Sequence, residues 1–345
     1  MGVHSVAVTG ASGLVGRHLL PVLAEHPDVE RVLGLDVREP ERRPRAVEFA
    51  RVDIAGTELK PLLEGIDVVV HLAGVVDPVP DVGLMARVNV EGTRHVLDAA
   101  ASVGARRVVR ISSATVYGAW PNNPIPLTED APLRPNPDFS PAVQGAEVER
   151  LLAEWRGSHP EVTVTTLRSA PVVGPGAERL PARILLGRPP LRVRGAVVPV
   201  QVVHVDDLAS ALALVATRDL PGVFNVASDG WLDAADAREL IPHTNVPALP
   251  AEALERVLRR AWDLGIGDVP AGVVPYLAHP WVISNERLRG VGWAPVHTNT
   301  DAIAEAVAAF PRRDPRPVVV AGSGVLVATG AAVVVFRRRA RRRSG

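Results

Sequence analysis

Short apolar runs alternate with amphipathic stretches through the first third of the chain, and this alternation predicts strands followed by helices. Val6 to Val8, Arg31 to Leu35, Val68 to Val70 and Arg107 to Ile111 are the apolar runs, and residues 88–101 have helical spacing. Repeated strand–helix units imply right-handed crossovers. The expected fold is therefore α/β and doubly wound, with a parallel sheet covered by helices on both faces.

The first apolar run ends in three glycines that precede a helical pattern. Gly10 permits a tight turn, Gly13 lets the main chain approach a pyrophosphate, and Gly16 lets the helix pack on the strand. The free N–H groups and the dipole at the start of the helix favour the negative charge. This pattern predicts a dinucleotide site, and its expected cofactor-binding residues are Gly10, Ser12, Gly13, Leu14, Val15 and Gly16.

An acidic residue after the second apolar run indicates which dinucleotide binds. Asp36 follows Gly16 by twenty residues. An acid at this distance takes the ribose hydroxyls of NAD, and its charge disfavours the extra phosphate of NADP. Arg38 lies close enough to soften that preference. We expect NAD, with NADP less favoured; the simpler alternative is a glycine-bearing turn that binds nothing.

Composition removes several other chemistries. The formal net charge is zero, so no nucleic-acid partner is expected. The absence of cysteine excludes disulfides, thiolate zinc sites and cysteine nucleophiles, and no metal is expected. The only lysine is Lys60, and the two tyrosines are Tyr117 and Tyr276. No basic stretch followed by a long apolar run opens the chain, so no signal peptide is expected.

Motifs that follow one another over about residues 5 to 308 resemble the extended short-chain dehydrogenase/reductases, the NAD-dependent epimerase/dehydratase family. The matching segments are Thr9 to Gly16, Val52 to Ile54, His71 to Gly74, Asn89 to Thr93, Ser112 to Gly118, Leu167 to Arg168, Val172 to Gly176, Val203 to Asp207 and Phe224 to Ala227. Their common order strengthens the resemblance beyond any single motif.

The resemblance implies roles for residues outside the glycine loop. Ser113 would hydrogen-bond the reacting oxygen of a substrate, and Asn89 would be a structural helix residue near the site. Asp53 would lie beside the adenine. The simpler alternatives are a strand-end cap at Asp53, a helix cap at Asn89 and a hydroxyl satisfied by main chain at Ser113. The further cofactor contacts that the resemblance implies are Asp53, Ile54, Leu72, Ala73 and Gly74.

The same resemblance divides the chain into two regions. The NAD-binding domain would comprise residues 1–175 and 199–228, and the substrate region residues 176–198 and 229–310. The substrate region is rich in arginine, and these side chains either clamp a diphosphate or form a solvated basic face: Arg183, Arg188, Arg192 and Arg194. A nucleotide sugar and a sterol-like lipid both remain open as ligands, and so does a homodimer.

The family's proton-transfer pair is missing. In the family a tyrosine and a lysine four residues apart share one helix face, and the lysine lowers the pKa of the phenol from about 10. The helix expected over Ser140 to Leu152 has Pro141 and Gly145 at those positions. Ser140 is expected as its N-cap and Pro141 as its first helical residue. No tyrosine–lysine pair with this spacing exists elsewhere in the sequence.

Two functions follow from this loss. The first is an NAD-binding protein that is catalytically weak or silent. The second is a working oxidoreductase, epimerase or dehydratase with atypical proton transfer, in which water, the substrate or Gln144 replaces the tyrosine.

The C-terminal segment differs from the rest of the chain. Residues 311–317 are typical of a linker, Val318 to Phe336 carry no charge, and residues 337–345 form a basic tail. A helix over 318–336 would span about 28 Å, close to the thickness of the hydrocarbon core of a bilayer. We therefore expect a transmembrane helix that attaches a cytoplasmic nucleotide-binding domain to a membrane. The alternative is a buried helix or an apolar strand pair.

Overall fold

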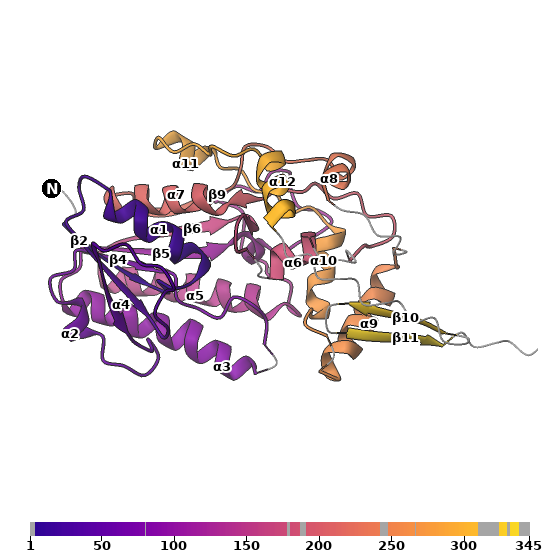
Figure 1. Ribbon diagram of the computed structural model, residues 1–345, viewed down its shortest axis with the longest axis horizontal. Helices are drawn as coiled ribbons and strands as arrows, with labels where there is room; N and C mark the ends of the chain where they lie inside the picture. Colours follow the sequence, from indigo (N-terminus) through magenta and orange to yellow (C-terminus); the bar gives the residue numbers. More distant parts are fainter. Residues whose placement is uncertain are drawn as a thin grey trace, which may run out of the picture.

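The computed structural model describes residues 4–79, 81–177, 180–186, 191–241, 248–265, 267–309, 324–329 and 332–337. A seven-stranded sheet is its middle layer, in the order β3-β2-β1-β4-β5-β6-β9, and all of its pairings are parallel (Figure 1). The strands are β1 (Ser5–Thr9), β2 (Arg31–Asp36), β3 (Val47–Arg51), β4 (Val68–His71), β5 (Arg107–Ser113), β6 (Thr163–Ser169) and β9 (Gly222–Val226).

The strand order reverses between β1 and β4. In a doubly wound sheet this reversal opens a crevice at the carboxyl ends of the strands on either side of it. The predicted α/β fold is confirmed.

Helices cover both faces of the sheet (Figure 1). Helices α1 (Leu14–Ala24) and α7 (Val205–Thr217) lie on one face, and α2 (Lys60–Leu63), α4 (Gly92–Ser102) and α5 (Ser140–Ser158) lie on the other. Successive side chains of a strand point to opposite faces. Val6 and Val8 therefore join the cluster of α1 and α7, whereas Ala7 between them joins the cluster of α4 and α5. Covering on both faces explains why the central strands β1 and β4 carry the unbroken apolar runs Val6 to Val8 and Val68 to Val70.

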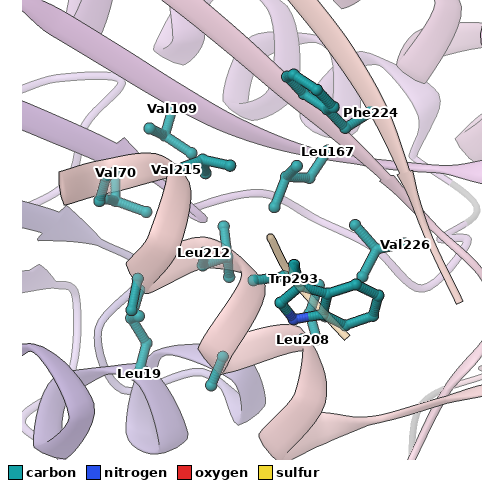
Figure 2. Packing of buried hydrophobic residues seen from close by; sticks show 14 of the residues in the cluster. Leu19, Val70, Val109, Leu167, Leu208, Leu212, Val215, Phe224, Val226 and Trp293 are labelled. Carbon is teal, nitrogen blue, oxygen red and sulfur yellow. The ribbon is translucent and has the colours of Figure 1, made fainter. Parts of the chain in front are cut away.

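The cluster on the α7 face reaches beyond the nucleotide-binding segments (Figure 2). Leu208 and Leu212 of α7 pack with Leu167 of β6 and Val226 of β9. Trp293, from the C-terminal part of the chain, lies in the same cluster. This part of the region predicted to hold substrate thus contributes to the core of the NAD-binding half.

The remaining elements lie mainly beyond the carboxyl ends of the strands. Two short strands, β7 (Val172–Val173) and β8 (Val203–His204), pair in parallel. The helices of this part are α6 (Leu180–Leu186), α8 (Ala234–Leu240), α9 (Ala251–Asp263), η3 (Ala271–Val273), α10 (Val274–Ala278), α11 (Glu286–Gly290) and α12 (Asn299–Ala309). Between β4 and α4 lie α3 (Val82–Ala86) and the π-helical turn η1 (Arg87–Glu91), and the 3₁₀ turn η2 (Ala114–Tyr117) follows β5.

The predicted C-terminal helix is wrong over the residues that the structure describes there. β10 (Gly324–Thr329) and β11 (Ala332–Arg337) pair antiparallel, with Val325 opposite Phe336 and Thr329 opposite Ala332. β-Branched valines favour strands over helices, and the sequence alternative of an apolar strand pair is the one found. Residues 311–317, 318–323, 330–331 and 338–345 of the predicted linker, helix and tail lie outside the described residues. Among the described residues, no helix has the length and apolarity needed to cross a bilayer.

Candidate functional site

The glycine loop after β1 is built by close main-chain contacts. Gly10 has φ of 72°, and a Cβ there would lie 2.6 Å from the amide nitrogen of Ala73. A Cβ on Gly16 would lie 2.5 Å from the carbonyl oxygen of Gly10, and one on Gly13 would lie 3.1 Å from the same oxygen. Side chains at Gly10 and Gly16 are therefore excluded on steric grounds, as predicted for a dinucleotide loop.

The first turn of α1 lies open to an anion. Its N-cap is Gly13, no side chain caps it, and no acidic residue occupies the first turn. The N–H groups at the start of a helix lack partners inside the helix. Leu14 and Val15, the first two helical residues, thus place amides where a pyrophosphate would be bound.

Asp36 is held at the edge of this loop. It is the last residue of β2, and its carboxylate accepts the N–H groups of Ser12 (2.9 Å) and Arg38 (3.2 Å). The hydroxyl of Ser12 donates to the carbonyl of Arg38. The structure therefore brings Ser12 and Asp36 together, with a carboxylate next to the open turn of α1, and their contacts with a cofactor stay predictions.

Asp53 and Ile54 lie in the segment after β3. Asp53 is exposed, and its carboxylate accepts the N–H of Ala55 at 3.0 Å, which is the strand-end turn of the simpler alternative. Ile54 is buried, and its Cδ1 would lie 3.0 Å from a Cβ on Gly92. The adenine contact of Asp53 stays a prediction.

A chain of hydrogen bonds links the end of β4 to η1. The N–H of Ala73 donates to Thr9 Oγ1 (3.3 Å), which lies 2.7 Å from Nδ1 of His71. On the other side, Nε2 of His71 lies 2.9 Å from Thr93 Oγ1, whose hydroxyl donates to the carbonyl of Asn89 (2.5 Å). Because the Thr93 hydroxyl already donates to Asn89, Nε2 of His71 carries a proton and donates to Thr93 Oγ1. The low pKa of this ring keeps it neutral, so Nδ1 accepts from Thr9 Oγ1. Complete burial holds the pKa of His71 well below its ordinary value, and the charge of Arg110 adds to this.

Asn89 extends that chain toward α5. Its side chain accepts the N–H of Val75 (2.7 Å) and donates to the carbonyl of Val75 (3.1 Å) and to Oε1 of Gln144 (3.0 Å). A Cβ on Gly74 would lie 3.1 Å from Asn89 Oδ1. Asn89 therefore fixes the segment after β4, the structural role that the resemblance implies, and Gln144 helps to hold it there.

Ser113 ends β5 at the same edge of the sheet. Its oxygen accepts the N–H of Thr115 (3.3 Å) and the hydroxyl of Thr115 (3.0 Å). Both bonds use Ser113 as the acceptor, so its own proton remains to be donated. No residue among those described accepts that proton, and the geometry suits donation to a ligand oxygen.

Helix α5 begins one residue earlier than predicted, so both Ser140 and Pro141 lie one position further into the helix. Ser140 is the first helical residue and makes no N-cap bond, because Phe139 occupies the N-cap position. Its hydroxyl lies 3.9 Å from the sulfur of Met85 instead. Pro141 lies in the first turn, where its missing N–H costs nothing. A Cβ on Gly145 would lie 3.0 Å from Cγ1 of Val116, so Val116 borders the space where the family lysine begins.

Tyr117 is a structural residue rather than a stand-in for the missing tyrosine. Its hydroxyl donates to Asn225 Oδ1 (2.8 Å) and accepts from Nη1 of Arg168 (2.7 Å). Burial raises the pKa of Tyr117 to about 12, although Arg168 opposes the shift. Arg168 also forms a buried pair with Glu149, with an Nη2–Oε2 distance of 2.6 Å. Burial alone would lower the pKa of Arg168, but the Glu149 carboxylate raises it.

Tyr276 is a site residue that the sequence analysis did not find. Its hydroxyl donates to the carbonyl of Thr115 at 2.8 Å, two residues beyond Ser113. Its ring lies against Phe139 and meets Trp281 edge-on, with centroids 5.2 Å apart in both pairs. Burial raises the pKa of Tyr276 well above its ordinary value, so the phenol stays protonated. No local motif marks it, because 161 residues separate it from Thr115.

These aromatic rings line a cavity of about 390 Å³ that begins at Thr115. Its wall is largely apolar and includes Phe139, Leu180, Ile184, Val273, Tyr276 and Trp281. Arg192 and Arg238 are exposed and contribute the charged part of the described lining. Of the other predicted arginines, Arg183 pairs with Asp268 (3.0 Å), Arg194 is exposed, and Arg188 lies outside the described residues.

A histidine cluster lies at the start of α7. Rings of His204 and His297 stack 3.9 Å apart, and Glu305 Oε2 lies 3.3 Å from Nε2 of His204. Nδ1 of His204 accepts the N–H of Asp206 as the N-cap of α7, so Nε2 carries the proton and faces Glu305. A metal at Nε2 would have to displace that proton. The arrangement therefore favours a capping histidine, with the Glu305 carboxylate near its Nε2.

Comparison with known proteins identifies the family of this chain. The profile of the NAD dependent epimerase/dehydratase family matches residues 6–227. The chain belongs to this family. The match confirms the family and the NAD cofactor that were predicted from the sequence.

Alignments with two relatives extend over most of both chains. An uncharacterized protein of Mycobacterium tuberculosis, Rv0501, is 30% identical over 86% of this chain and 81% of its own. A Streptomyces protein named 3-diazoavenalumate denitrifying reductase is 29% identical over 85% of this chain and 96% of its own.

Solved structures share the fold of this family member. The UDP-glucose 4-epimerase of Thermus thermophilus in complex with NAD superposes with a TM-score of 0.69 at 24% identity, covering 89% of this chain and 98% of its own. MoeE5 in complex with UDP-glucuronic acid and NAD also has a TM-score of 0.69 at 24% identity, with 88% and 98% covered.

Proposed function

We propose that this epimerase/dehydratase family member binds NAD(H) at the carboxyl ends of β1, β2 and β4 and holds a small ligand beside Ser113, with weak or no turnover. The observation that carries the proposal is a complete dinucleotide cradle next to a helix without titratable groups at positions 141 and 145. Gly10 and Gly16 leave the cradle open, while Pro141 and Gly145 offer no proton.

The residues of the cradle have separable tasks. Amides of Leu14 and Val15 would hold the pyrophosphate, and the carboxylate of Asp36 would accept the ribose hydroxyls and repel the phosphate of NADP. When bound, the nicotinamide supplies or accepts a hydride. Ser113 would donate its free proton in a hydrogen bond to the ligand, because Thr115 already occupies its oxygen.

Loss of a positioned proton donor lowers turnover by a factor of about 10² to 10⁴. Gln144 does not replace the tyrosine in this proposal, since its amide is buried and bonded to Asn89. Weak turnover would then depend on Ser113 and on water.

The second candidate is an active oxidoreductase, epimerase or dehydratase with atypical proton transfer. Tyr276 favours it, because a protonated phenol lies at the cavity beside Thr115. The name of the Streptomyces relative, a reductase, supports hydride chemistry in a protein about 29% identical to this one. The names of the two solved neighbours include nucleotide sugars, which therefore belong in a substrate screen. Lipid-like molecules belong there because the cavity wall is largely apolar.

Cofactor titration followed by single-turnover measurement tests both candidates. We expect NADH to bind with a change in its fluorescence, and more tightly than NADPH. Absence of binding for either dinucleotide would overturn the cradle assignment. Hydride transfer from NADH deuterated at C4 is then followed over the substrate panel: slow or absent transfer supports the first candidate, and fast transfer that is lost in Tyr276→Phe supports the second.

Attachment to a membrane was expected from a helix over residues 318–336, and β10 and β11 occupy much of that range. A homodimer remains a proposal, and light scattering of the full chain with NADH measures it directly.

A further inference from the structure

The apolar cavity beside Ser113 has uncharged polar side chains in its wall, but these already form hydrogen bonds within the protein. The amide of Gln201 donates to the carbonyls of Gly230 and Ile283 (both 2.9 Å) and accepts the N–H of Ile283 (2.8 Å). Trp281 Nε1 donates to the carbonyl of Tyr276 (3.0 Å), and the hydroxyl of Tyr276 donates to Thr115. A sugar in this cavity would leave most of its hydroxyls without partners, which carries a large desolvation penalty.

The shape of the wall suits a flat apolar body. Phe139, Tyr276 and Trp281 present three rings in successive contact, and aliphatic side chains from α6 and η3 close the space around them. A volume of about 390 Å³ is within the range of sites for small organic ligands. Aromatic rings pack favourably against other rings in tilted or offset arrangements.

The charged part of the lining is cationic. Arg192 precedes β8 in the chain and Arg238 belongs to α8, and neither has an ion-pair partner among the described residues. Arg183 is not part of the described lining, and its guanidinium pairs with Asp268 instead. Guanidinium groups bind carboxylates in paired, charge-assisted hydrogen bonds.

We propose that the ligand of this cavity is an amphipathic organic acid, with an apolar, ring-sized body among Phe139, Tyr276 and Trp281 and a carboxylate at Arg192 and Arg238. The end opposite the carboxylate lies toward Thr115, beside Ser113. The inference rests on the proposed function for its position next to the dinucleotide, but the recognition of the acid depends on the cavity alone.

Calorimetry on the full chain saturated with NADH tests the proposal with three probes. Naphthalene-2-acetate carries a flat body and one carboxylate, its amide removes the charge, and UDP-glucose represents the nucleotide sugars. We expect the acid to bind about tenfold more tightly than the amide, and UDP-glucose to bind more weakly than either. An amide as good as the acid, or UDP-glucose as the tightest of the three, would overturn the proposal.

Arginine variants locate the carboxylate. Arg192→Gln and Arg238→Gln should each reduce the preference for acid over amide by about fivefold, because each removes one charge-assisted partner. Arg194→Gln is the matched control: Arg194 is exposed and two residues from Arg192, but it is not part of the lining. Equal preference in Arg192→Gln, Arg238→Gln and the unsubstituted chain would show that the acid binds elsewhere.

The test of the ligand can be distinguished from the test of the cofactor. NADH affinity is measured first in the same samples and without the probes. Loss of NADH binding would overturn the proposed function, whereas normal NADH binding without an acid preference would overturn only the assignment of the ligand.

Discussion

The NAD-binding half and the substrate region treat buried polar groups in opposite ways. In the NAD-binding half, buried polar side chains form hydrogen-bonded networks: His71 joins Thr9 to Thr93, and Arg168 joins Glu149 to Tyr117. In the substrate region, apolar side chains from distant segments enclose a space, and the polar groups there bond away from it. Satisfied networks fix one geometry, while an apolar space selects a ligand mostly by excluding others.

The largest expected effect is on the stability of the NAD-binding half, and it comes from removing one partner of the Arg168–Glu149 pair. Arg168→Met should reduce the free energy of unfolding by about 3–5 kcal/mol, because it leaves a buried carboxylate without its partner. Urea denaturation measures the loss. The control is Arg31→Met, whose pair with Glu48 is half-exposed and should cost about 0–1 kcal/mol. Equal losses for the two variants would show that the buried network does not stabilise this half.

The cradle itself is tested by Gly10→Ala. The added Cβ lies 2.6 Å from the main chain of Ala73, and φ is 72°, so we expect NADH affinity to fall about 100-fold, equivalent to about 2.7 kcal/mol. Fluorescence titration with NADH gives the value.

Gly65→Ala is a matched control for that substitution. Gly65 has the same φ of 72°, but a Cβ there meets nothing within 4 Å. Its cost should appear in stability at about 1 kcal/mol, with NADH affinity unchanged. A similar fall in affinity for both glycine variants would mean that backbone strain, rather than contact with Ala73, controls the site.

Acid should destabilise the NAD-binding half through His71. The pKa of the folded imidazole lies well below that of the unfolded chain, about 6.5, so below this pH the unfolded chain binds a proton that the folded chain does not. Stability contributed by the neutral form is complete above pH 6.5. It falls by up to about 1.4 kcal/mol per pH unit below that value, until the folded pKa is reached.

Denaturation between pH 7.5 and 5 measures that slope, and an NMR titration of His71 identifies its source. The imidazole signals of His71 should not move over this range in the folded protein. A folded His71 that titrates near pH 6.5 would contradict the neutral assignment in the network.

The smallest effect that we expect comes from rebuilding the missing pair. Pro141→Tyr with Gly145→Lys should raise single-turnover hydride transfer little, because Val116 borders the start of the new lysine at 3.0 Å. Adding Val116→Ala should give about a tenfold rise over the double variant, well below the natural contribution of about 10² to 10⁴. Deuterium transfer from labelled NADH is the measurement. Equal rates in the double and triple variants would show that Val116 does not limit the lysine.

Local patterns were sufficient to predict the strand, turn and helix that form the glycine loop. The loop from Gly10 to Gly16 and Asp36 at the end of β2 depend on residues within one strand–turn–helix unit, and the structure places them as expected. Finer local features were less secure. Ser140 was expected to cap α5, but Phe139 takes that position, and a valine-rich run that suits a membrane helix also suits the strand pair that is present.

The substrate side could not be predicted in the same way. Tyr276 reaches Thr115 across 161 residues, and Arg192 and Arg238 meet the same cavity from separate segments. Sequence spacing carries no information about such contacts, since they depend on how short helices pack beyond the sheet. Whether a polar group of the cavity wall is free to bind a ligand depends on its hydrogen-bond partners inside the protein, and the sequence does not show these partners.

The main-chain contact between Gly10 and Ala73 bears on how a gene of this kind can diverge. Amide groups and the lack of a Cβ define the cradle, so replacements at most surrounding positions leave its chemistry untouched. Side chains alone define the cavity, and each replacement there alters its shape. A duplicated copy can therefore keep its dinucleotide through long divergence while it acquires a new small molecule in a few mutational steps.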